Sequence, residues 1–116
     1  MSGGPRDNDY LGHILEAIER IDAYLAGVDQ TWFLRDAMVQ DAVIRNLEVV
    51  GEAARRLSAE FVATTPHIPW RDIAGMRNRL AHGYFAINLL TVWNVTQKDL
   101  PTLLKQVRDI VGKGIA

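Results

Sequence analysis

The sequence predicts an all-α protein, an antiparallel bundle of four to five helices. Apolar residues recur every three or four positions through most of the 116 residues, which is the period of one face of an α-helix. No stretch of useful length alternates between apolar and polar residues, as a half-buried strand would. Without an internal repeat or a linker, residues 1–116 are expected to form a single domain in which residues 1–7 are disordered.

The first helix is expected to begin near Tyr10, with Asn8 or Asp9 as its N-cap. Residues 27–30 interrupt its pattern and are expected to form the first connection. The apolar face that predicts this helix comprises Leu11, Ile14, Leu15, Ile18, Ile21, Leu25 and Val28.

A second, longer helix is expected to follow, with Asp29 or Thr31 as its N-cap. Its apolar residues extend to Leu57. Between residues 43 and 50 they occupy more than one side of the helix. We therefore expect this helix to be central in the bundle or to lie at a subunit interface.

Proline and glycine divide the second half of the chain. Residues 63–69 contain two prolines and are expected to form a loop, and Pro69 suits the first turn of a helix from Trp70 to about His82. Gly83 is expected just past the end of that helix, where a positive φ favours glycine.

The last helix is expected to begin after Asn88, which is a suitable N-cap. Pro101 should bend or restart it, because proline has no N–H to donate within a helix. Beyond Pro101 the helical period continues through Leu103, Leu104, Val107 and Ile110.

Composition excludes several classes of chemistry. The chain has no cysteine, so disulfides, thiolate catalysis and cysteine-based zinc sites are absent. No apolar stretch approaches the length of a membrane span, and the first eight residues do not resemble a signal peptide. We therefore expect a cytoplasmic protein that does not act at a membrane.

The charges of the chain are unevenly distributed. The 13 Lys+Arg nearly balance the 14 Asp+Glu, which argues against extensive coating of nucleic acid. Residues 1–44, however, hold three basic and eight acidic residues, whereas residues 45–116 carry a basic excess. The near-neutral total therefore leaves room for a small basic site in the second part of the chain.

Residues 77–84, Arg-Asn-Arg-Leu-Ala-His-Gly-Tyr, are unusually rich in chemically active side chains. Arginine matches the oxygens of a phosphate, and histidine exchanges a proton near neutral pH. If the helix reaches His82, the negative end of its dipole favours the imidazolium form, which suits a general acid. Arg77 and His82 would then point about 140° apart, so they could also act on one phosphate across a twofold dimer interface.

Such a pair is sufficient for metal-independent RNA cleavage, with the ribose 2′-OH as the nucleophile and a 2′,3′-cyclic phosphate as the product. No metal or cofactor is expected, because the three histidines are scattered and no paired-carboxylate motif is present. His13 and His67 are interpreted as structural residues. Glu48 and Glu52, one turn apart, could pair with the motif arginines or form a solvated face.

Each motif residue also has a structural interpretation. His82 could bond to a carbonyl at a helix end, Arg77 and Arg79 could be solvated charges, and Tyr84 could lie at the rim of the core. Considered separately, these residues do not decide between the two interpretations.

The arrangement from Arg77 to Tyr84 resembles the R-x4-H-x-Y motif of the HepT-like branch of the HEPN superfamily (higher eukaryotes and prokaryotes nucleotide-binding domain). Residues 41–53 are similar to the second helix of that family, and residues 68–78 to its approach to the motif. The Leu100-Pro101 step is also similar. The resemblance extends over roughly residues 8–111.

This resemblance implies a homodimeric, metal-independent ribonuclease toxin of a toxin–antitoxin system, with RNA as its substrate. Arg77 and His82 would be the catalytic pair, and Asn78 and Arg79 would support it and bind RNA. The partner would be a minimal nucleotidyltransferase antitoxin (MNT), which silences the toxin by AMPylation of Tyr84. The bulky anionic nucleotide would repel the RNA backbone.

Two alternatives remain open at this stage. The chain could be a catalytically silent helical module that binds nucleotide or dimerises and partners a nucleotidyltransferase. It could also be a purely structural bundle.

Overall fold

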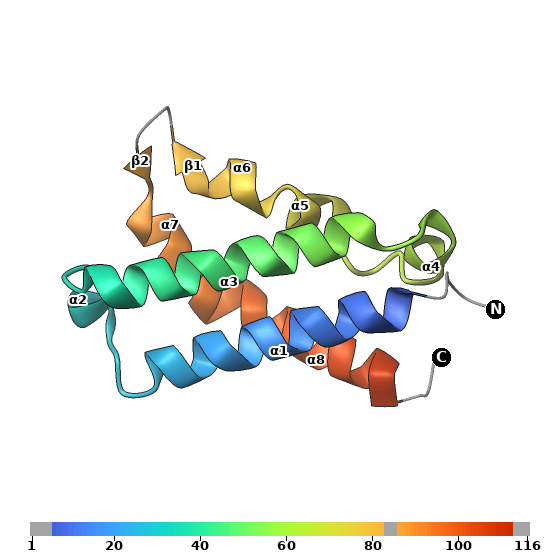
Figure 1. Ribbon diagram of the computed structural model, residues 1–116, viewed down its shortest axis with the longest axis horizontal. Coiled ribbons are helices and arrows are strands. Elements are labelled where there is room, and N and C mark those ends of the chain that lie inside the picture. Colours follow the sequence, from blue (N-terminus) through green and yellow to red (C-terminus); the bar gives the residue numbers. More distant parts are fainter. Residues whose placement is uncertain (1–5, 83–85, 113–116) are drawn as a thin grey trace.

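The computed structural model describes residues 6–82 and 86–112, and for residues 77, 79, 81, 82, 86 and 87 it describes the backbone alone. Within these residues the chain is almost entirely helical, as predicted (Figure 1). The elements are α1 (Asp7–Leu25), α2 (Gln30–Phe33), α3 (Ala37–Arg56), α4 (Ala59–Thr64), α5 (Trp70–Ala74), α6 (Met76–Leu80), β1 (Ala81–His82), β2 (Ala86–Ile87), α7 (Leu89–Asn94), the π-helical segment η1 (Val95–Asp99) and α8 (Leu100–Gly112).

Helix α1 begins earlier than its apolar period predicts. Residues 1–5 lie outside the described residues. Arg6, not Asn8 or Asp9, is the N-cap residue, and Asp7 is ordered and buried, which corrects the expected disorder at residues 6 and 7. The reason lies far away in the chain: the Asp7 carboxylate accepts hydrogen bonds from the backbone N–H and the hydroxyl of Ser58, at 2.8 and 2.7 Å. Gly27, with a φ of 77°, follows the helix as part of the expected connection.

The predicted second helix is divided into α2 and α3. Asp29 caps α2 as expected, because its carboxylate accepts the N–H of Trp32. Asp36 then caps α3 in the same way, through the N–H of Val39. The break lets Phe33 turn inward, where it is fully buried and its ring lies 5.4 Å from that of Trp93.

Helix α3 is central in the bundle, which was one of the two positions expected for the second helix. It packs against α1 on one side and against α5 and α6 on another (Figure 1). Val43, Leu47 and Val50 are fully buried on one face of it, and Ile44 and Val49, which lie to either side of that face, are partly buried against the core. This placement accounts for apolar residues on more than one side of the helix.

A short helix, α4, includes the first two residues, 63 and 64, of the expected loop. Ser58 caps it by accepting the N–H of Phe61, and the loop begins only at Thr65. Trp70 opens α5, and its indole Nε1–H donates to Thr65 Oγ1 at 2.8 Å in the buried interior. This bond fixes the loop to the start of α5.

The last helical run begins after Asn88, whose side chain accepts the N–H of Thr91 as a cap, as predicted. The run changes to the wider π-helical form over η1 and returns to α-helix at Leu100, one residue before Pro101. The expected restart at Pro101 is therefore confirmed. Proline has no N–H for a regular helical bond, and a change of helical form at this point accommodates it.

Candidate functional site

The motif residues that the structure describes lie on α6 and β1. We call α5, α6 and β1 the motif segment, and its helices α5 and α6 pack against α3. Met76 and Leu80, one turn apart on α6, are both 2% exposed and anchor this helix to the core. Asn78, between them, is exposed. The backbone of Arg77 and Arg79 belongs to α6, and that of His82 to β1.

The expected helix from Trp70 to His82 is wrong in two respects. It is interrupted at Gly75, and it ends at Leu80, so His82 is in an extended strand and pairs with Ala86. The carbonyl of Leu80 accepts the N–H of Asn88 at 3.2 Å and is therefore not engaged in a further helical turn. His82 consequently does not lie on the helix that carries Arg77, and the 140° argument does not apply.

Tyr84 and Gly83 lie outside the described residues. The hairpin that leads to them, β1 and β2, lies beyond α6 and α7, on the side of the molecule away from α1 (Figure 1).

Gly51 determines how closely the motif segment approaches α3. A Cβ at this position would lie 3.2 Å from the carbonyl oxygen of Ile73 and 3.4 Å from Cβ of Met76. The first distance is shorter than ordinary van der Waals contact, so only glycine permits the observed packing without displacement. The position of α6, and with it the backbone of Arg77, depends on this contact.

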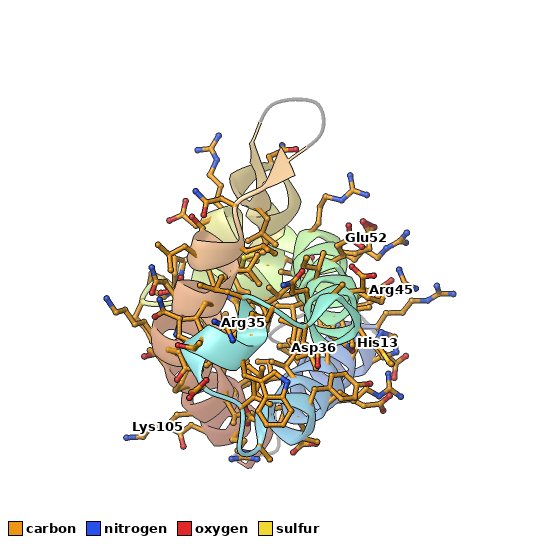
Figure 2. The ribbon with its side chains drawn as sticks, turned by 90° about the vertical axis from the view of Figure 1, so that its left-hand side faces the viewer. His13, Arg35, Asp36, Arg45, Glu52 and Lys105 are labelled. Atoms are coloured by element: carbon orange, nitrogen blue, oxygen red, sulfur yellow. The ribbon has the colours of Figure 1, made fainter. Side chains whose placement is uncertain are left out.

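A groove of about 810 Å³ runs between α1, α3 and the motif segment, and we call it the α3 groove. Asn78 contributes to its lining, so the groove reaches α6. Figure 2 shows His13 on α1 and Arg45 and Glu52 on α3 along one side of the molecule, with Lys105 on the opposite side. The cationic and aromatic residues that line the α3 groove are Arg6, Tyr10, His13, Arg45, Arg55 and Arg56.

Glu52 organises one end of this groove. Its carboxylate accepts hydrogen bonds from Arg55 (2.9 and 3.0 Å) and from Arg56 (3.0 Å), both on its own helix. The bond from Arg55, followed by that from Arg56, holds the pKa of Glu52 below its ordinary value. Glu48 also lines the groove. The side chains of Arg77 and Arg79 are not described, so pairing of Glu48 or Glu52 with them stays a hypothesis.

A second groove of about 800 Å³ lies on the other side of the motif segment, between α5 and the η1–α8 run. Gly75 and Met76 contribute to it from the motif side and Lys98 from η1. The backbone that carries Arg77 thus passes between two grooves. Among the described residues, no three histidine or acidic side chains gather closely enough to hold a metal ion.

Sequence reasoning did not identify the arginines of the α3 groove as functional candidates. The available signal was their spacing: Arg45, Glu48, Glu52 and Arg56 recur at intervals of three and four, which places them on one face of α3. No helix within the described ranges is long and apolar enough to cross a membrane.

Comparison with known proteins identifies the family. The model of the HepT-like ribonuclease family matches residues 14–110. "Putative RNase TTE0752" of Caldanaerobacter subterraneus subsp. tengcongensis is 38% identical over 104 residues, which is 90% of this chain and 93% of that protein. "Probable ribonuclease HepT" of Thermococcus cleftensis is 41% identical over 95 residues, 82% of this chain and 86% of that protein.

A third relative is longer. "Gamma-glutamylcyclotransferase and putative RNase MJ0434" of Methanocaldococcus jannaschii is 41% identical over 102 residues, which is 88% of this chain but 46% of that protein. No solved structure matches significantly. The family match covers most of the chain, and residues 77–84, which carry the R-x4-H-x-Y arrangement, lie within it. The chain therefore belongs to the HepT-like ribonuclease family.

Proposed function

We propose that this protein is a cytoplasmic, metal-independent endoribonuclease toxin of a HEPN/MNT toxin–antitoxin system, with Arg77 and His82 as its catalytic pair. The observation that carries the proposal is the complete motif within the matched family region, residues 14–110. The exposure of Asn78, beside Arg77 in the chain, supports access of a substrate to α6.

Cleavage would use the 2′-OH of the substrate as its nucleophile. Neutral His82 removes the 2′-OH proton as the oxygen attacks phosphorus, and an imidazolium donates a proton to the departing 5′ oxygen. The P–O5′ bond breaks, and the products are a 2′,3′-cyclic phosphate and a 5′-OH. Arg77 stabilises the charge that develops on the phosphoryl oxygens, while Asn78 and Arg79 help to hold the RNA.

The need for both a base and an acid in this reaction favours a dimeric site. One histidine cannot be base and acid at the same moment, whereas two copies of His82 across a twofold cleft could divide these roles. We therefore include a homodimer in the proposal. Its Arg77 and His82 residues could then meet within one protomer or between the two.

The test of catalysis is RNA cleavage by the purified protein in the presence of a chelator. His82→Ala and Arg77→Ala should each abolish cleavage while the thermal unfolding curve and the oligomeric state remain those of the wild type. The matched controls are His67→Ala, which removes an exposed histidine of the loop before α5, and Arg20→Ala, which removes an exposed arginine of α1. Cleavage that survives both motif substitutions would refute the assignment.

The toxin role and the regulation need separate tests. Expression should arrest growth unless a minimal nucleotidyltransferase is co-expressed, whereas a catalytically silent module would not arrest it. With that enzyme and ATP, mass spectrometry should find AMP on Tyr84, and Tyr84→Phe should escape silencing. Silencing with an unmodified Tyr84 would contradict the proposed regulation.

A further inference from the structure

The α3 groove combines the two kinds of side chain that bind single-stranded RNA. Arg45, Arg55 and Arg56 supply positive charge from α3. Tyr10 and His13 supply two rings from α1, with centroids 6.2 Å apart and edge to face. Proteins bind single-stranded RNA through basic grooves that follow its backbone and through aromatic faces on which bases stack.

The groove is long enough to hold more than one nucleotide. Arg45 and Arg56 are eleven positions apart on one face of α3, which corresponds to about 16 Å along the helix axis. Asn78 lines the same groove from α6. RNA lying along α3 would therefore reach the segment that carries Arg77.

The charge of the groove is positive although two carboxylates line it. Four arginines, Arg6 and the three on α3, line the groove together with Glu48 and Glu52. Glu52 holds two of these guanidinium groups in place but neutralises only one positive charge. The side chains of Arg55 and Arg56 remain 67% and 58% exposed, so a phosphate can reach both guanidinium groups from solvent.

We propose that the α3 groove binds the single-stranded RNA that flanks the cleavage point, with its phosphates on Arg45, Arg55 and Arg56 and a base against Tyr10 or His13. This inference rests on the proposed function, because it assumes that the substrate is RNA and that it is cut at the motif. It assigns substrate binding to residues outside the motif.

The experiment measures RNA binding separately from cleavage. Binding of a labelled single-stranded oligoribonucleotide is followed by fluorescence anisotropy between about 50 and 200 mM salt, in a His82→Ala background that does not cut it. The groove variant is Arg45→Gln/Arg55→Gln/Arg56→Gln. The matched control is Arg20→Gln/Arg35→Gln/Arg108→Gln, which removes the same charge from three exposed arginines that do not line the groove.

The groove variant should bind about tenfold more weakly, and its plot of log K against log salt should be shallower by about 2, since each phosphate contact on a single strand contributes about 0.7. The control variant should change affinity through net charge but retain the salt slope. Tyr10→Leu should weaken binding without altering the slope, because it removes a stacking face and no charge.

Cleavage provides the second measurement. With His82 intact, the groove variant should raise KM for a long RNA by a larger factor than KM for a dinucleotide, which is too short to extend along α3. If the protein cleaves RNA and the groove variant has the same salt slope as the protein with an intact groove, the inference is overturned and the proposed function stands. If the groove variant loses RNA binding but the protein with His82 intact never cuts RNA, the proposed function is refuted and RNA binding by the α3 groove is supported. A changed oligomeric state in light scattering would identify the groove as a protein interface and also overturn the inference.

Discussion

Replacement of Gly51 by alanine should reveal how far the motif segment depends on close packing against α3. In a helix interior, Gly→Ala by itself stabilises by about 1 kcal/mol, because glycine has the larger conformational entropy to lose. At Gly51 the new Cβ would lie 3.2 Å from the backbone oxygen of Ile73. Overpacking of this kind typically costs about 1–3 kcal/mol. The expected net change is therefore a loss of stability of up to about 2 kcal/mol.

Gly12 provides the matched control. It also lies inside a long helix, α1, but nothing lies within 4 Å of the position that its Cβ would occupy. Gly12→Ala should therefore stabilise the protein by about 1 kcal/mol. The difference between the two variants, about 1–3 kcal/mol, isolates the close contact of α3 with the motif segment.

Two assays measure the consequences. Urea unfolding gives the two free energies, and the rate of RNA cleavage reports the position of the motif. Gly51→Ala should lower the rate even where the protein is fully folded, because α5 and α6 must move by a few tenths of an ångström, whereas Gly12→Ala should leave it unchanged. Equal stabilisation by both substitutions would refute the argument that this glycine sets the approach of the two elements.

Three further predictions concern single contacts. Thr65→Val leaves the buried indole N–H of Trp70 without an acceptor and should cost about 1–3 kcal/mol, with a fall in Tm of about 4 °C per kcal/mol in thermal unfolding. Asp7→Ala removes both hydrogen bonds to Ser58 and should cost about 2–3 kcal/mol in urea unfolding. The pKa of Glu52 in the folded protein lies below its ordinary value of 4.5, so its ionised carboxylate stabilises the folded state above about pH 4.5, and this stabilisation is lost as the pH falls through the folded pKa. An NMR titration of Glu52 should therefore show a midpoint below 4.5.

Each of these predictions has a control. Trp70→Phe combined with Thr65→Val should cost less than the sum of the single changes, since it removes the stranded donor as well. For Asp7, an unfolding midpoint equal to that of the wild type would show that the contact contributes nothing. In Arg55→Gln the midpoint of Glu52 should rise, because the hydrogen bond from Arg55 is the main cause of the lowered pKa.

Local patterns in the sequence predict most helices and two of their caps correctly. Asp29 and Asn88 bond to the backbone three residues later, so everything needed to recognise these caps lies within one turn. The period of the apolar residues likewise identifies α1 and α3. Short helices are harder: α2 and α4, with four and six residues, contain too few apolar positions for a period to be recognised.

The positions of the helix ends near the site depend on residues far away in the chain. Asp7 is ordered by Ser58, 51 positions later, and no local pattern around Asp7 indicates that partner. The motif helix ends at Leu80 because β1 and β2 pair and Asn88 bonds to the Leu80 carbonyl. Both features are consequences of chain segments that meet only in the folded protein.

The sequence by itself determined the helical class and the order Arg77, His82, Tyr84, because both are recognised from the spacing of residues that lie close together in the chain. Only the tertiary structure decided that His82 lies on a strand, that Gly51 brings the motif segment against α3, and that the arginines of α3 share a groove with Tyr10 and Asn78. The physical reason is that helical periodicity arises from neighbours within four residues, whereas a site is assembled by packing between elements that are distant in the chain.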